Sequence, residues 1–137
     1  MRTLVIDTAT RACSVALFDG KQLLAVQHEV IGRGHAERLL PLISALPDNG
    51  KADQVMVNVG PGSFTGIRVG VAAAKALGLA WHIDVYGYGC LALVAAMGRS
   101  TLSEATAILP PGPAEGRILL IESRAKGAAL PYHRHKL

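Results

Sequence analysis

Residues 60–66 (GPGSFTG) are the part of the sequence best suited to hold an anion. They follow a β-branched stretch and precede a helical pattern, so free backbone N–H groups and the positive end of a helix would meet there. Gly62, Ser63 and Thr65 could then contact a phosphate group. Alternatively, Ser63 or Thr65 could cap the helix and satisfy the same donors. A Walker A motif is excluded, because no Lys-Ser/Thr pair follows the last glycine.

A second candidate, Asp7-Thr8-Ala9-Thr10, lies between the first two expected strands. Its carboxylate and hydroxyls, Asp7 and Thr10 above all, could face a nucleotide phosphate or a hydrated magnesium ion. Asp and Thr are also common in turns, and this alternative remains open. Two-metal nuclease chemistry requires several converging carboxylates. Asp7 has no such partner on a neighbouring strand, which argues against nuclease activity.

The histidines and cysteines do not have the spacing of a metal or catalytic site. Residues 35–37 (HAE) begin a helical pattern, where a glutamate simply stabilises the positive helix end. His28 and His35 do not form a His-x-x-x-His pair, and Cys13 and Cys90 have no CxxC spacing. The sequence therefore predicts no metal ligands, and it offers no nucleophile–base pair from which a catalytic site could be assembled.

The composition predicts one domain with an aliphatic core. The chain has 137 residues, of which 50% are hydrophobic and only 4% aromatic. So few aromatic residues argue against an RNA-binding module built on stacking platforms. Residues 1–116 carry nine basic and nine acidic side chains, so the net charge of +4 belongs to the segment after them. This distribution argues against a nucleic-acid surface on the folded body.

The distribution of apolar and charged residues predicts neither a signal peptide nor a membrane-spanning helix. The first apolar run is too short for a signal-peptide core, and charged residues interrupt the longest apolar stretch. Two cysteines without a second pair are typical of a reducing compartment. We therefore expect a soluble, cytoplasmic protein with no membrane partner.

Apolar alternation and helical spacing predict the order β-β-β-α-β-α-β-α. The expected elements are strands at 3–6, 13–18 and 23–30, a helix at 35–46, a strand at 54–59, a helix at 67–79, a strand at 83–86 and a helix at 90–97. Hairpin-linked strands followed by strands that alternate with helices imply an α/β fold with a mixed sheet, in the ribonuclease-H-like arrangement. We expect this lobe to occupy residues 1–98. Residues 99–137 form a Pro/Gly-rich, basic C-terminal segment with one possible isolated strand at 118–121.

The first two expected helices differ in composition from an ordinary surface helix. The first is rich in leucine and the second in glycine and alanine, which suits close packing against a partner chain. Packing on the protein's own sheet is the alternative. The residues predicted to contact a partner are Leu39, Leu42, Ile43, Arg68, Ala73 and Ala76.

Four segments, taken together, resemble one family. They are residues 5–10 (VIDTAT), 13–16 (CSVA), 35–41 (HAERLLP) and 60–70 (GPGSFTGIRVG). In this combination the chain is similar to the TsaB (YeaZ) family over Met1 to about Met97. The resemblance implies an actin-like/Hsp70-like ATPase-superfamily fold, in which the family's second, C-terminal lobe is missing or much reduced.

The same resemblance implies a function. The chain would be a non-catalytic scaffold and dimerisation subunit of the bacterial machinery that makes threonylcarbamoyladenosine beside the anticodon of tRNA. It would pair with the subunit TsaD through its first two helices, or with a second copy when isolated. An ATPase subunit, TsaE, would join them, and tRNA would be contacted only through the complex.

The resemblance also assigns cofactors: ATP and metal belong to the partner subunits, and this chain needs none of its own. Two other functions stay open. One is a nucleotide-binding phosphotransferase that uses Asp7, Thr10 and residues 60–66. The other is a glycoprotease-like peptidase.

Overall fold

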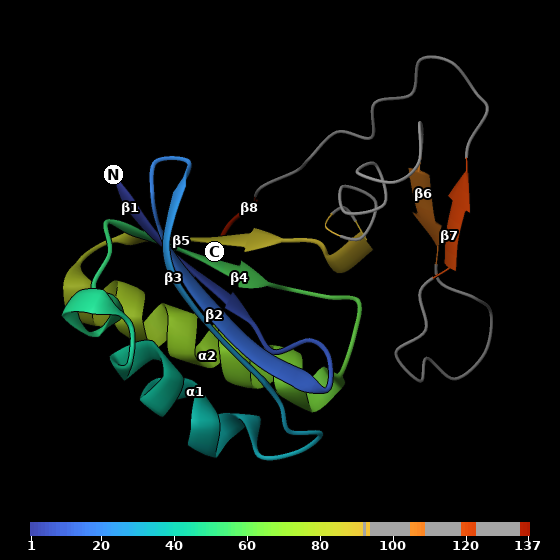
Figure 1. The fold of residues 1–137 in the computed structure, drawn as a ribbon, viewed down its shortest axis with the longest axis horizontal. Helices are drawn as coiled ribbons and strands as arrows, with labels where there is room; N and C mark the ends of the chain where they lie inside the picture. Colours follow the sequence, from blue (N-terminus) through green and yellow to red (C-terminus); the bar gives the residue numbers. More distant parts are fainter. Residues whose placement is uncertain (92, 94–104, 109–118, 123–134) are drawn as a thin grey trace.

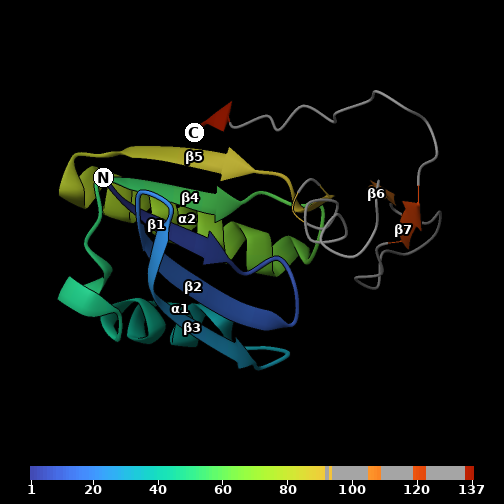
Figure 2. The same ribbon diagram turned by 45° about the horizontal axis from the view of Figure 1, so that its top comes forward.

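A computed structural model describes residues 1–91, 93, 105–108, 119–122 and 135–137 (Figure 1). Within these residues, two α-helices cover one face of a six-stranded sheet, as Figures 1 and 2 show. The elements are β1 (Arg2–Asp7), β2 (Ala12–Asp19), β3 (Gln22–Val30), α1 (His35–Ser44), the 3-10 helix η1 (Pro47–Gly50), β4 (Gln54–Asn58), α2 (Phe64–Trp81), β5 (Asp84–Tyr88), β6 (Ala105–Ile108), β7 (Leu119–Glu122) and β8 (His135–Lys136).

The sheet has the strand order β3-β2-β1-β4-β5-β8. β1, β2 and β3 pair antiparallel, whereas β4 pairs parallel with β1 and β5 parallel with β4. The predicted α/β fold with a mixed sheet is therefore confirmed. Because β1, β4 and β5 run in the same direction, their carboxyl ends meet at one edge of the sheet.

The core lies between the sheet and the two helices. Alternate side chains of the central strands point into it, as the period of a strand requires. The buried residues that form it include Leu4, Ile6, Cys13, Val15, Leu17, Leu39, Leu42, Ile43, Leu46, Val55, Val57, Ala74 and Val85.

The interface prediction is wrong for Leu39, Leu42 and Ile43, which are only 1–3% exposed. Helix α1 has ten residues and one apolar face. That face is needed to cover the sheet, so its buried residues are unavailable to a partner. The exposed large hydrophobic residue of this helix is Leu40.

Helix α2 begins at Phe64, three residues before the predicted start at 67. Ser63 is its N-cap, and the Ser63 hydroxyl accepts a hydrogen bond from the backbone N–H of Gly66 at 3.2 Å. The cap adds a turn to the helix that the apolar pattern alone does not mark.

The remaining differences concern the C-terminal part of the chain. The predicted helix at 90–97 starts at Cys90, but most of it lies outside the described residues. The strand expected at 118–121 is observed as β7, and it pairs antiparallel with β6 rather than standing alone. β8 joins the main sheet beside β5, where Lys136 forms an ion pair with Asp84 at 2.7 Å. The boundary near residue 98 stays a prediction.

An ion pair fixes α1 to the edge of the sheet. The Arg38 guanidinium donates hydrogen bonds of 2.9 and 2.6 Å to the two carboxylate oxygens of Glu29 on β3. These bonds hold the pKa of Glu29 below its usual range. Any stability that the pair adds is therefore present at neutral pH and is lost as the pH falls through that lowered pKa.

Candidate functional site where two loops meet

The loop at residues 60–66 lies directly against the loop after β1. The backbone N–H of Ser63 donates to the carbonyl of Ala9 at 2.7 Å. In the opposite direction, the hydroxyl of Thr8 donates to the carbonyl of Gly66 at 2.6 Å, and Thr8 is fully buried. The two candidate segments of the sequence are thus hydrogen-bonded to each other.

Two glycines of the loop are required by this close approach. A β-carbon on Gly62 would overlap the carbonyl oxygen of Ala9, and one on Gly66 would overlap the carbonyl oxygen of Thr8. Neither glycine has a positive φ; in this loop that conformation belongs to Gly60, with φ of 97°. The glycines therefore serve backbone contact rather than a left-handed turn.

Asp7 joins the ends of three parallel strands. Its Oδ2 accepts hydrogen bonds from Asn58 Nδ2 at 3.0 Å and from the hydroxyl of Tyr88 at 3.3 Å. Its Oδ1 accepts one from the backbone N–H of Ala9 at 3.1 Å. Asn58 is fully buried, and its Oδ1 accepts a hydrogen bond from the N–H of Gly60 at 2.8 Å. The carboxylate thus connects β1, β4, β5 and the loop.

We expect Asp7→Asn to lower the free energy of unfolding by about 1–3 kcal/mol, measured by urea denaturation. Whichever way the new amide turns, its NH₂ group would replace one of the two accepting oxygens. The donors that this oxygen served would then face another donor and lose their acceptor. Asp19→Asn is the matched control, because Asp19 lies at the surface and its ion pair with the N-terminus is exposed. Equal stability of Asp7→Asn and the parent would contradict this structural role and favour a catalytic one.

The other residues of the predicted anion site occupy different places. Ser63 caps α2, so the capping alternative describes it. The hydroxyl of Thr10 accepts a hydrogen bond from the backbone N–H of Ala12 at 3.2 Å. Thr65 is exposed and lines a neighbouring pocket. Asn58 and Tyr88 were not among the predicted site residues, although an asparagine near the end of an apolar strand is a signal for Asn58.

That pocket has a volume of about 480 Å³ and lies where α1 and α2 begin. Its lining residues are Gly32, Arg33, Gly34, His35, Ala36, Glu37, Ser63, Thr65, Gly66 and Val69. His35 is buried, and its Nε2 donates to the carbonyl of Thr10 at 2.8 Å. This bond anchors the start of α1 to the loop after β1.

The two cysteines are buried, and burial raises the pKa of both the Cys13 and the Cys90 thiol. Both are therefore poor nucleophiles at neutral pH.

In the part of the chain that the structure describes, no three potential metal ligands gather. No helix among those residues is long and apolar enough to cross a membrane.

Comparison with known sequences identifies a family and several relatives. The model of the family described as "TsaD: tRNA N6-adenosine threonylcarbamoyltransferase" matches residues 23–110. The tRNA threonylcarbamoyladenosine biosynthesis protein TsaB of Escherichia coli is 36% identical over 114 residues, which cover 80% of this chain and 48% of that protein. The protein of the same name from Bacillus subtilis is 34% identical over 72% of this chain and 45% of its own length. The chain thus spans about half the length of these relatives.

Comparison with solved structures also finds similar proteins. YeaZ from Pseudomonas aeruginosa superimposes with a TM-score of 0.67 at 28% identity, over 99% of this chain and 67% of that one. RuvC from Thermus thermophilus superimposes with a TM-score of 0.52 at 15% identity, over 84% of this chain and 85% of RuvC. At that identity the second likeness shows the fold alone, which is ribonuclease-H-like.

Proposed function

The chain belongs to the TsaB (YeaZ) family, and we propose that it acts in tRNA threonylcarbamoyladenosine biosynthesis as a non-catalytic subunit that pairs with TsaD. The relatives carry this pathway in their names. The scaffold role is supported by the hydrogen bonds that engage Asp7 and Ser63 within the fold, where Asp7 connects strand ends and Ser63 caps α2.

The observation that carries the pairing proposal is the outer face of α1 and α2. α2 turns four small residues toward the sheet, at positions 66, 70, 74 and 78. Ala73 packs against the core, whereas Ala72, Ala76 and Leu79 face outward. Leu79 is 78% exposed, and Leu40 on the adjacent helix is 54% exposed. Apolar side chains exposed on two adjacent helices are typical of a protein–protein interface.

The residues exposed on α1 and α2 differ from those predicted from the sequence to contact a partner. The glycines of α2 serve close packing on the protein's own sheet: a β-carbon on Gly70 would overlap the Thr8 hydroxyl, and one on Gly78 would overlap Val85. The partner surface that we propose consists of Leu40, Ala72, Ala76 and Leu79. Arg68 is exposed at its border.

The remaining partners follow from the same proposal. TsaE joins the pair, a second copy replaces TsaD when the chain is isolated, and the complex works in the cytoplasm. ATP and the metal ion are held by the partner subunits. No observation favours a peptidase or a phosphotransferase.

Reconstitution tests the proposal. This chain is mixed with the TsaD and TsaE homologues of its own organism, unmodified tRNA, threonine, bicarbonate and ATP, together with the enzyme that supplies the activated threonylcarbamoyl group. Modified nucleosides are measured by mass spectrometry after tRNA digestion. We expect product with all subunits present and little or none when this chain is omitted. Modification that proceeds equally well without this chain would contradict the proposal.

A further inference from the structure

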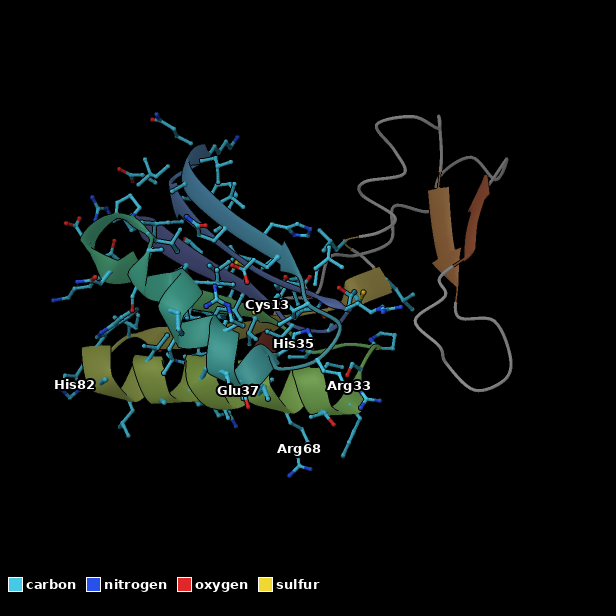
Figure 3. The ribbon with its side chains drawn as sticks, turned by 60° about the horizontal axis from the view of Figure 1, so that its bottom comes forward. Cys13, Arg33, His35, Glu37, Arg68 and His82 are labelled. Atoms are coloured by element: carbon cyan, nitrogen blue, oxygen red, sulfur yellow. The ribbon has the colours of Figure 1, made fainter. Side chains whose placement is uncertain are left out.

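Three arginines lie on the segments near the start of α1 and α2, and two of them, Arg33 and Arg68, line neighbouring pockets. Arg11 lies in the loop after β1, and its Nη2 is 3.6 Å from the position of a β-carbon on Gly32. The N–H of Gly32 donates to the carbonyl of Arg11 at 2.9 Å, which holds Arg33, the next residue, close by. Figure 3 shows Arg33 and Arg68 at this end of the helices, with His82 at the other end of α2.

These arginines are free to bind an anion. In the described part of the chain, the ion pairs of arginine side chains involve Arg2 and Arg38, so Arg11, Arg33 and Arg68 have no carboxylate partner there. Unpaired guanidinium groups at one place create a positive potential that attracts anions.

An exposed aromatic ring lies beside Arg68. Phe64 is 75% exposed, and the guanidinium carbon of Arg68 lies 5.2 Å from the centre of its ring. A ring with a guanidinium stacked on it offers a flat surface to a nucleic-acid base. We call Arg11, Arg33, Phe64 and Arg68 the arginine corner.

The pocket at the start of the helices borders this corner. Arg33 and Thr65 line it, and Thr65 and Arg68 line the shallow hollow beside it. Its volume of about 480 Å³ is in the range of small-ligand sites. Glu37 is the acidic residue among its lining side chains, so the corner keeps an excess of positive charge.

We propose that the arginine corner binds RNA directly, with its guanidinium groups on phosphates and Phe64 beneath an unstacked base. This inference rests on the proposed function, in which tRNA is the substrate, and it adds a direct contact to a chain expected to reach tRNA only through its partners. The balance of charge over residues 1–116 does not reveal the corner, because acidic residues elsewhere offset it.

Fluorescence anisotropy with a labelled, unmodified tRNA transcript and the whole chain tests this proposal over a range of salt concentrations. We expect Arg33→Gln/Arg68→Gln to bind about tenfold more weakly, with a salt slope smaller by about 1.4 to 1.8, because two phosphate contacts are lost. Phe64→Ala should weaken binding about fivefold or more and leave the slope unchanged. Melting curves check that each variant is folded.

Two control variants test whether the loss of tRNA binding is specific to the arginine corner. Lys75→Gln removes a positive charge from an exposed site further along α2, and Arg124→Gln/Lys126→Gln removes two from the basic C-terminal segment. Both should bind tRNA within about twofold of the parent, because neither removes a guanidinium group or the ring of the arginine corner. The inference is overturned if either control weakens binding as much as the arginine corner variants do, or if those variants bind like the parent. Unchanged RNA binding combined with lost TsaD binding would assign the corner to an acidic protein partner instead.

The same variants distinguish this inference from the proposed function. A chain that supports threonylcarbamoyl transfer but binds RNA independently of the corner overturns the inference alone. A chain that binds RNA through the corner, but whose omission leaves tRNA modification unchanged, overturns the proposed function instead.

Discussion

Replacing Gly66 by alanine is expected to lower the free energy of unfolding by about 3 kcal/mol or more, measured by urea denaturation. In an exposed helix the same change stabilises by about 1 kcal/mol, since alanine is the better helix former. Here the new methyl group would overlap the carbonyl oxygen of Thr8. The helix must then move away from β1, which also breaks the hydrogen bond between the Thr8 hydroxyl and the Gly66 carbonyl.

Gly89→Ala is the matched control for Gly66→Ala. Among the residues that the structure describes, the nearest atom to a β-carbon on Gly89 would be the carbonyl oxygen of Gly60 at 3.9 Å, and Gly89 has no positive φ. Its stability should fall by no more than about 1 kcal/mol, the cost of alanine in place of glycine just before the helix that starts at Cys90. If Gly66→Ala melts at the parent temperature, the loop does not depend on this close contact.

Replacing Ala76 by arginine is expected to weaken pairing with TsaD by at least about 30-fold while leaving the fold intact. Ala76 is exposed on α2, so a long side chain meets no obstacle within the chain itself. Against a partner it would hold two helices apart and bury a charge without a counterion. Co-elution of the two purified proteins and the melting temperature of the variant give the two readouts.

Gln22→Arg is the control for Ala76→Arg, because it adds the same charge at an exposed position of β3, away from both helices. It should bind TsaD like the parent. Substitutions at Leu39 or Ala73 would not test the interface, since Leu39 is buried and Ala73 packs on the core. A folded Ala76→Arg variant that still binds TsaD with parental affinity would place the interface elsewhere.

The order of the elements from β1 to β5 could be predicted because each of these helices and strands has a clear period. The alternation in residues 12–19 and the helical spacing after His35 are local properties of the sequence. The start of α2 does not follow from the sequence alone, since Ser63 suits both an anion site and a cap, and only the position of the Gly66 N–H decides between them.

Features that depend on distant contacts could not be predicted. Leu39 belongs to the apolar face of a helix, but the sequence pattern does not indicate whether a sheet of the same chain or a partner chain covers that face. The positions of Thr8 and Ala9 against residues 62–66 follow from the register of β1 on β4. β8 has two residues, which is too short for any period.

The hydrogen bond from Thr8 to Gly66 also bears on how the chain folds as it leaves the ribosome. It joins residues 58 positions apart. The β1–β2–β3 meander needs only the first 30 residues, so it can form early in synthesis. One edge of β1 then has no strand partner until β4 has been synthesised. The apolar side chains of β1 that pack against α2 stay uncovered until α2 has been synthesised as well. During that interval the nascent chain exposes an unpaired strand edge, which is when aggregation, or protection by a chaperone, is decided.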